Sequence, residues 1–289
     1  MDAFLQYTVQ GLAAGGFYAL AALGLAVIFG ALGVVNFAHG AFYMLGAVTS
    51  AVLLDVLGLN FWASLVVVPI LMFVFGIIIE LLLVQWLLKL DILYNFLLTF
   101  GLSLVLVDLV KRQYGVSSLP YEVPPGLEGL LVIGAVELPI YQLFVFAFSL
   151  VVCLVVWFVL SKTRVGMIVR AATEEPERAR ALGINVSAWV TPVFGFGVAL
   201  AGLAGVLAAP FRAITATMGS NFIIILFAIV VIGGLGSVLG AVVAGFLVGL
   251  VEAYGQGYAG TFSQVLIFVL MAVVIMVRPA GLFGRKEAV

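Results

Sequence analysis

The side chains best suited to chemistry in this chain lie between Arg164 and Val186. This interval carries seven charged residues: Arg164, Arg170, Glu174, Glu175, Glu177, Arg178 and Arg180. Long apolar stretches precede and follow it, and charged side chains are costly in lipid. The interval is therefore expected outside the membrane, where it can contact a soluble partner. The alternative interpretation is a solvated surface helix that only joins two membrane spans.

A short helix is predicted inside this interval, from about Pro176 to Leu182. Proline suits the first helical turn because its missing N–H is not needed there, and glutamates favour the positive end of the helix dipole. Ala179 and Leu182 belong to an apolar strip, and Gly183 suits a left-handed C-terminal cap. The residues expected to dock on a partner are Glu174, Glu175, Pro176, Glu177, Arg178, Ala179, Leu182 and Gly183.

Two glycine-containing joints interrupt the apolar sequence, near residues 36–40 and 233–237. The residues of interest in them are Asn36, His39, Gly40, Gly234, Gly236 and Ser237. Polar side chains at membrane depth usually face protein or a water-filled path, and a broken helix is tolerated only where something satisfies its backbone groups. These residues are therefore candidates for a substrate path. The alternative is that Asn36 and His39 merely cap two helix ends.

Glu252 is a lone carboxylate within an apolar span. It is either a proton carrier, as in a secondary transporter, or a residue near the outer end of the span that bonds a neighbour.

His39 is the only histidine and Cys153 the only cysteine, which excludes a multi-histidine metal site and a disulfide framework within these residues. The sequence shows no phosphate-loop motif, nucleophile–base pair or paired catalytic carboxylates. It is therefore not expected to bind ATP or to act as an enzyme.

The composition specifies a membrane protein. Of 289 residues, 65% are hydrophobic and 9% are charged, and the mean hydropathy is +1.35. A soluble domain of this size would expose too much apolar surface. Apolar runs of about 18 or more residues predict spans near 7–30, 41–58, 61–88, 92–110, 141–160, 188–209, 222–236, 238–255 and 261–277. We predict an all-α polytopic protein with eight or nine transmembrane helices, some discontinuous, in one domain over residues 1–289.

The positive charges divide unequally between the two sides of this arrangement. One side holds Lys89, Lys162, Arg164, Arg170, Arg178, Arg180, Arg278, Arg285 and Lys286, and the other holds Lys111, Arg112 and Arg212. The positive-inside rule makes the first side cytoplasmic. Nine crossings then place the N-terminus outside, and eight place it inside. The largest external loop runs from about Lys111 to Pro139, where prolines and Gly126 predict irregular structure.

Four segments carry a resemblance to a known family. Residues 170–184, RAATEEPERARALGI, resemble the coupling-helix segment of ABC importer permeases of the branched-chain amino acid type. Residues 36–40, NFAHG, are similar to the first membrane break of that family, and residues 233–237, GGLGS, to its second. Residues 278–284, RPAGLFG, resemble its C-terminal end. The four segments occur in the family's order and extend over nearly the whole chain.

The resemblance implies a permease subunit in the bacterial inner membrane. It implies pairing with a second, related permease, docking of two cytoplasmic ATPases on the coupling helices, and delivery of substrate by an external binding protein. ATP and magnesium would bind the partner subunits, and no cofactor or nucleic acid would bind this chain. The implied cargo is a branched-chain or other aliphatic amino acid, with amides, urea or small aromatic acids as the alternative. A self-sufficient secondary transporter is the rival from another class, although it would have no particular need for a charged docking helix.

Overall fold

The structure, a computed structural model, describes residues 2–33, 35–87, 91–133, 136–174, 176–183 and 185–284. Within these ranges, seven helices are long and apolar enough to cross a membrane: α1 (Asp2–Leu32), α2 (His39–Leu57), α3 (Phe61–Ile79), α5 (Ile92–Tyr114), α6 (Ile140–Lys162), α9 (Val186–Ala208) and α11 (Val238–Ala259). Two apolar helices are shorter, α10 (Met218–Gly233) and α12 (Ser263–Val277). The prediction of an all-α polytopic protein is confirmed, and these nine helices lie where nine apolar stretches predicted them.

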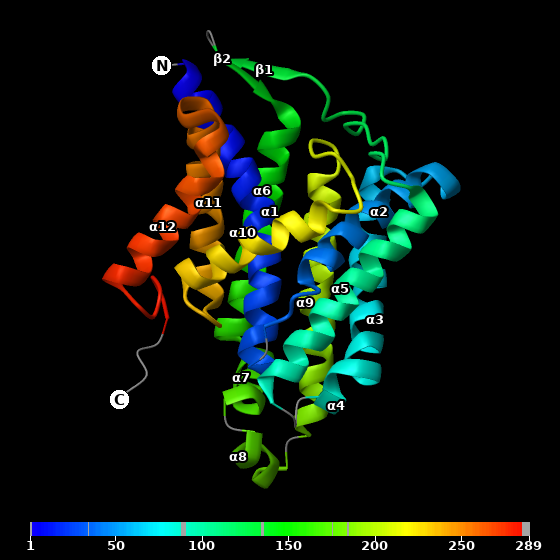
Figure 1. Cartoon of the computed structure of the whole chain (residues 1–289), viewed down its shortest axis with the longest axis vertical. Helices are drawn as coiled ribbons and strands as arrows, with labels where there is room; N and C mark the ends of the chain where they lie inside the picture. Colours follow the sequence, from blue (N-terminus) through cyan, green and yellow to red (C-terminus); the bar gives the residue numbers. More distant parts are fainter. Residues whose placement is uncertain are drawn as a thin grey trace.

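The two ends of the molecule differ in structure (Figure 1). The N-terminus lies beside a short β-hairpin at one end, and two polar helices, α7 (Arg164–Glu174) and α8 (Pro176–Ala181), form the other. Lys111 and Arg112 end α5 on the hairpin side, whereas Lys162 ends α6 next to α7. These positions agree with the sides predicted from the positive charges. Helices α1 and α12 both run from the hairpin end toward the end that carries α7 and α8 (Figure 1), which agrees with nine crossings and an external N-terminus.

The external loop after α5 contains more regular structure than predicted. Strand β1 (Leu130–Ile133) pairs antiparallel with β2 (Val136–Pro139), and Leu131 lies opposite Leu138. The prediction of irregular structure is therefore wrong for the last part of this loop. Pro120, Pro124, Pro125 and Gly126 occupy only the first part, while the second part is rich in leucine, valine and isoleucine, and β-branched residues suit a pleated strand.

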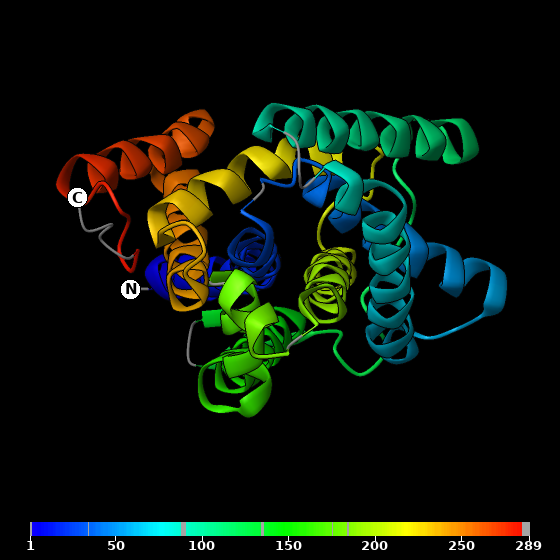
Figure 2. The ribbon, with the colours of Figure 1, turned by 90° about the horizontal axis from the view of Figure 1, so that it is seen from below.

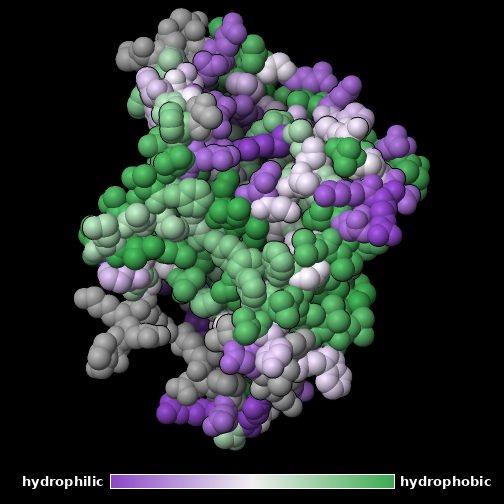
Figure 3. Space-filling model, in the orientation of Figure 1, coloured by the Kyte–Doolittle hydropathy of each residue, from purple (hydrophilic) through white to green (hydrophobic). Residues whose placement is uncertain are grey.

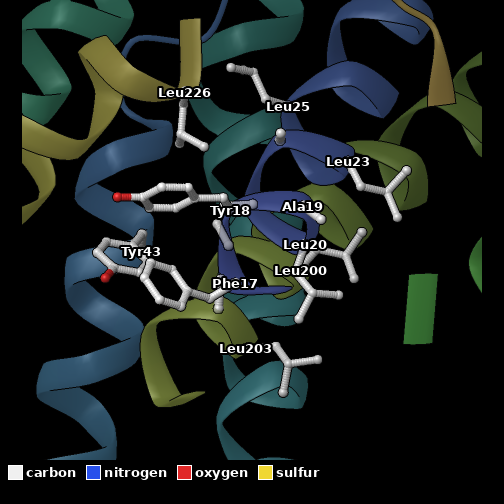
Figure 4. Packing of buried hydrophobic residues seen from close by; sticks show 14 of the residues in the cluster. Phe17, Tyr18, Ala19, Leu20, Leu23, Leu25, Tyr43, Leu200, Leu203 and Leu226 are labelled. Carbon is white, nitrogen blue, oxygen red and sulfur yellow. The ribbon is translucent and has the colours of Figure 1, made fainter. Parts of the chain in front are cut away.

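Helix α1 forms the centre of the bundle. It packs most extensively against α11 and next against α9. Helices α1 and α9 are buried to a similar degree, whereas α5 and α6 expose most of their surface. Figure 2 shows α1 and α9 inside the ring formed by the other helices. The side chains of Phe17, Tyr18 and Leu20 on α1 meet Tyr43 of α2 and Leu200 of α9 in the core (Figure 4).

Close helix packing depends on glycines at the crossing points. A Cβ atom on Gly46 of α2 would lie 2.7 Å from the carbonyl carbon of Gly202 on α9. A Cβ atom on Gly249 of α11 would lie 2.5 Å from the Cα of Gly15 on α1. Both distances are shorter than carbon atoms tolerate, so only glycine permits these crossings. Small residues have this function in many membrane helix pairs, because they let the backbones approach.

The surface follows the same division into a middle and two ends (Figure 3). Hydrophobic residues cover the middle of the face shown, and hydrophilic residues gather toward both ends. Large apolar side chains are also exposed along α5, for example Leu97 and Leu104. In a bilayer the hydrophobic middle of the protein lies in the hydrocarbon region, where exposed apolar side chains have no hydration cost.

Candidate functional site

The polar interval between α6 and α9 ends in a helix that projects from the bundle. The helix predicted from Pro176 to Leu182 is observed as α8, one residue shorter. Leu182 follows it with 82% of its surface exposed, and Gly183 has a φ of +81°. The Gly183 amide donates to the Arg180 carbonyl at 2.9 Å, which closes the last turn. The predicted left-handed glycine at the end of this helix is therefore present.

The buried side chain of Ala179 packs α8 against the body of the protein. Ala179 is 2% exposed and packs with Ala172 of α7 and with Val186 and Val190 at the start of α9. The Glu177, Arg178 and Arg180 side chains are exposed around it. Glu174 is the last residue of α7, Pro176 is the first of α8, and Glu175 lies outside the described residues. Among the described side chains, the buried Ala179 is thus flanked by exposed residues on α8 and directly after it.

The first joint, before α2, is buried and internally hydrogen bonded. The Asn36 Oδ1 accepts from the Ala38 amide at 3.0 Å, and the Asn36 carbonyl accepts from the His39 amide at 3.2 Å. The His39 Nε2 pairs with the Ala21 carbonyl of α1 at 2.9 Å, which assigns the proton to Nε2. Both side chains are almost fully buried, and Asn36 Nδ2 and His39 Nδ1 find no hydrogen-bond partner among the described residues. The start of α2 has no side-chain cap, and His39 pairs with the middle of α1 rather than with a helix end. Capping and a role in a substrate path therefore both stay predictions.

The second joint lies between α10 and α11. Gly234 and Gly236 have φ values of +101° and +75°, and the Ser237 Oγ accepts from the Gly240 amide at 3.1 Å. Ser237 therefore caps the start of α11. Gly236 and Ser237 also line a cavity of about 460 Å³, together with the end of α1, α7 and Phe283.

The two joints lie at opposite ends of one helix, α10. Gly40 of the first joint packs against Gly219 in the first turn of α10, and α10 ends at Gly233 in the second joint. A helix of this length separates the joints by about 20 Å at 1.5 Å per residue. The structure therefore connects the six predicted path residues through α10 but does not gather them around one point.

A polar cluster lies near the hairpin end, and of its two charged residues only Glu252 was a candidate from the sequence. Arg212, in the segment between α9 and α10, pairs with Glu252 of α11 at 3.2 Å and donates to the Tyr18 hydroxyl at 3.1 Å. The Tyr18 hydroxyl in turn donates to Glu252, and the Gln256 amide donates to it at 3.2 Å. Glu252 thus bonds its neighbours, which favours this interpretation over proton carriage. Burial alone lowers the pKa of Arg212, but the nearby Tyr18 and Glu252 outweigh it and raise that pKa above its usual value, so Arg212 stays charged.

Two cavities adjoin this cluster. One, of about 300 Å³, is lined by Gln10, Ala14, Gln142, Phe211, Arg212, Glu252, Ala253 and Gln256. The second, of about 330 Å³, lies between the 118–121 segment and residues 209–213, and it shares Phe211 and Arg212 with the first. The Leu119 amide fixes these two external segments together by donating to the Ile214 carbonyl at 2.9 Å. Arg212 therefore stands between two hollows on the external side.

A second buried carboxylate lies toward the other end of the bundle. Glu80 opens the π-helical turn Glu80–Val84 that continues α3 into α4 (Gln85–Leu87), and it is 2% exposed. The Thr191 hydroxyl on α9 donates to its Oε2 at 2.7 Å. Glu80 was not among the predicted site residues, although it is a lone acid inside an apolar run, which is the signal that marked Glu252.

Comparison with known proteins decides the family. A family model described as branched-chain amino acid transport system, permease component, matches residues 7–276. The chain belongs to this family. It is 32% identical over 302 residues to the high-affinity branched-chain amino acid transport system permease protein BraD of Pseudomonas aeruginosa, with 98% of this chain and 97% of the relative covered. It is 29% identical over 299 residues to LivH, the permease of the same description in Salmonella typhimurium and Escherichia coli, with 98% and 96% covered.

Family membership confirms several expectations from the sequence. The chain is a multi-pass membrane permease, homologous to permeases of the bacterial inner membrane, and a transport component rather than an enzyme. Permeases of this family bind no cofactor themselves, as expected here. The description as one component of a transport system also means that this permease works with other components.

Proposed function

We propose that this permease is the membrane-spanning subunit of an ATP-driven importer for branched-chain and other aliphatic amino acids. The named cargo of BraD and LivH supports this choice. The residues of the two joints also support it, because Asn36, His39 and Ser237 can hydrogen-bond a solute without holding an ion tightly. The alternative within the same importer type is an amide, urea or a small aromatic acid.

The proposed complex contains a second related permease, two cytoplasmic ATPases that bind ATP and magnesium, and an external binding protein. The observation that carries the ATPase assignment is the exposed Leu182 at the tip of α8. A leucine in this position lies beyond the apolar band, beside exposed charges, where lipid does not cover it. An apolar residue ringed by charged ones is the usual composition of a protein docking site.

Movement of α8 would reach the substrate path through α9. Ala179 packs on Val186 and Val190, so a displacement of α8 shifts the first turns of α9. Farther along, α9 contacts α2 through Gly202, where the two backbones are in direct contact. Because packed helices move as rigid bodies, a shift of α9 is passed to α2 and the joint before it. In this proposal the ATPases switch the path formed by Asn36, His39, Gly40, Gly234, Gly236 and Ser237 between outward and inward access.

The docking assignment is tested by replacing Leu182 with glutamate in the tagged permease. We expect Leu182→Glu to abolish co-purification of the ATPases while the permease remains in the membrane. Val116, 78% exposed in the external loop, provides the matched control. Val116→Glu should retain the ATPases. Equal recovery of the ATPases with both variants would contradict the docking role of α8.

The cargo is tested by uptake into vesicles that contain the complete transporter. Leucine, isoleucine and valine should each compete for uptake, and uptake should require ATP. Competition by an amide or an aromatic acid but by none of the three amino acids would assign the alternative cargo. Uptake by this chain alone, without ATPases, would favour the secondary transporter.

A further inference from the structure

The external cavity beside the Arg212–Glu252 pair has the composition of a binding site for a small dipolar solute. Its polar side is formed by one positive charge, one negative charge and the glutamines 10, 142 and 256. Its apolar side is formed by Phe211 and two alanines. Its volume of about 300 Å³ lies at the lower end of the range of small-molecule sites. Such a mixture of convergent polar groups and an apolar wall is typical of small-molecule sites.

The described protein uses only part of the hydrogen-bonding capacity of Arg212. The Arg212 guanidinium has five N–H donors, and its hydrogen bonds within the described structure, to Tyr18 and Glu252, both come from one nitrogen, Nη2. The Arg212 side chain is 39% exposed, whereas that of Glu252 is 5% exposed. Arg212 can therefore accept a further partner from the cavity while it keeps its present ones.

We propose that this cavity binds the zwitterionic head group of an α-amino acid on the external side of the permease, with the carboxylate at Arg212 and the ammonium at Glu252. The proposal rests on the proposed function, which it extends by naming a site. A paired cation and anion carry no net charge. A zwitterion offers an opposite charge to each member of the pair and adds no net charge. A cation or an anion adds a net charge to the site, and an uncompensated charge is costly away from water.

The position of the site fits delivery from outside. Glu252 lies two turns before the end of α11, at the hairpin end of the molecule. Arg212 also borders the second external cavity, so both hollows can exchange solute past its side chain. Phe211 borders both hollows as well, and it supplies an apolar surface for an aliphatic side chain. The site therefore precedes the joints of α10 on a route inward.

The test measures protection of a cysteine in the cavity by unlabelled solutes. The complete transporter in proteoliposomes carries Gln142→Cys in a Cys153→Ala background, and a small water-soluble methanethiosulfonate reagent is the probe. Leucine is compared with leucinamide, which lacks the carboxylate, and with 4-methylpentanoate, which lacks the ammonium. Leucine at about ten times its dissociation constant should slow the modification about tenfold. The other two solutes should leave the rate unchanged.

A pair of variants distinguishes binding from a purely structural ion pair. Glu252→Gln keeps hydrogen-bonding atoms for Tyr18 and Arg212 but removes the charge, so protection by leucine should disappear. Glu80→Gln, at the other buried carboxylate, should retain it. Equal protection by all three solutes, no protection by leucine, or protection that survives in Glu252→Gln would each overturn the proposal. If leucine is transported without protecting the cysteine, only this site is wrong, and if leucine is not transported at all, the proposed cargo is wrong.

Discussion

The backbone amide of Leu282 donates a hydrogen bond to the carbonyl oxygen of Ile232, with an N···O distance of 2.8 Å. The next amide, of Phe283, donates to the Gly233 carbonyl at 3.0 Å. The last carbonyls of a helix have no partner within it, and here the C-terminal segment supplies partners for the end of α10. The second joint and the RPAGLFG motif are thus one structural unit, although 40 or more residues separate them along the chain.

Removal of this segment should destabilise the second joint. Truncation after Arg278 leaves the carbonyls of Ile232 and Gly233 without these donors, and an unpaired buried carbonyl costs about 1–3 kcal/mol. We expect a lower midpoint of thermal unfolding in detergent and a lower yield of folded permease. Truncation after Gly284 retains both donors and is the control. Identical midpoints for the two truncations would show that the pairing adds no stability.

Gly183 is predicted to be required for coupling. Its φ of +81° is a left-handed conformation that β-branched residues avoid, at a cost of about 1–3 kcal/mol. Gly183→Val should therefore distort the end of α8 and reduce transport, with the permease still in the membrane. Gly183→Asn is the matched control, because asparagine tolerates this conformation. Wild-type rates of leucine uptake in Gly183→Val would refute the assignment.

Tyr18 should stabilise the external polar cluster through its hydroxyl group. This hydroxyl donates to Glu252 and accepts from Arg212, so Tyr18→Phe leaves both charges with one partner fewer. We expect the free energy of unfolding to fall by about 1–3 kcal/mol. Tyr43 is also buried, and no hydrogen bond of its hydroxyl is seen among the described residues, so Tyr43→Phe should cost much less. Equal thermal midpoints for the two variants would contradict this role.

The helices were predictable because lipid imposes one simple rule on sequence. A span must satisfy all its backbone groups and remain apolar over its length, so Phe61–Ile79 and Ile140–Lys162 were visible from composition alone. The hairpin β1–β2 was missed because it lies outside the membrane, where that rule does not apply. Its stability comes from pairing between strands, and neither strand has a strong signal by itself.

The site was predictable only where the signal is local. Pro176, the glutamates and Gly183 predicted the bounds of α8 to within one residue, because helix caps depend on neighbours along the chain. The partnership of Arg212 and Glu252 depends on three-dimensional packing. A clue was nevertheless present, because these two are the only charged residues between Arg180 and Arg278. Two lone residues of opposite charge in an otherwise neutral membrane segment are expected to form an ion pair.

The role of the first joint in transport is the remaining prediction. Asn36, Ala38 and His39 are buried in this structure, whereas Phe37 is half-buried. If the joint lines a path that opens during the cycle, cysteines placed at these positions one at a time should change reactivity with nucleotide. We expect His39→Cys to react slowly with a water-soluble thiol reagent in the resting transporter and faster in another nucleotide state. A role limited to capping predicts that the reaction rate stays low throughout.

The experiment needs a background without Cys153 and a control for the reagent. Cys153→Ala removes the native thiol, which is buried. Leu57→Cys, at a position 64% exposed at the end of α2, should react at one rate in every state. Gly40 is left unchanged, because a Cβ atom there would lie 2.9 Å from that of Ile223 and force α2 and α10 apart. A nucleotide-dependent rate at His39 against a constant rate at Leu57 would therefore place the first joint on the moving path, since exposure in the absence of motion cannot produce that difference.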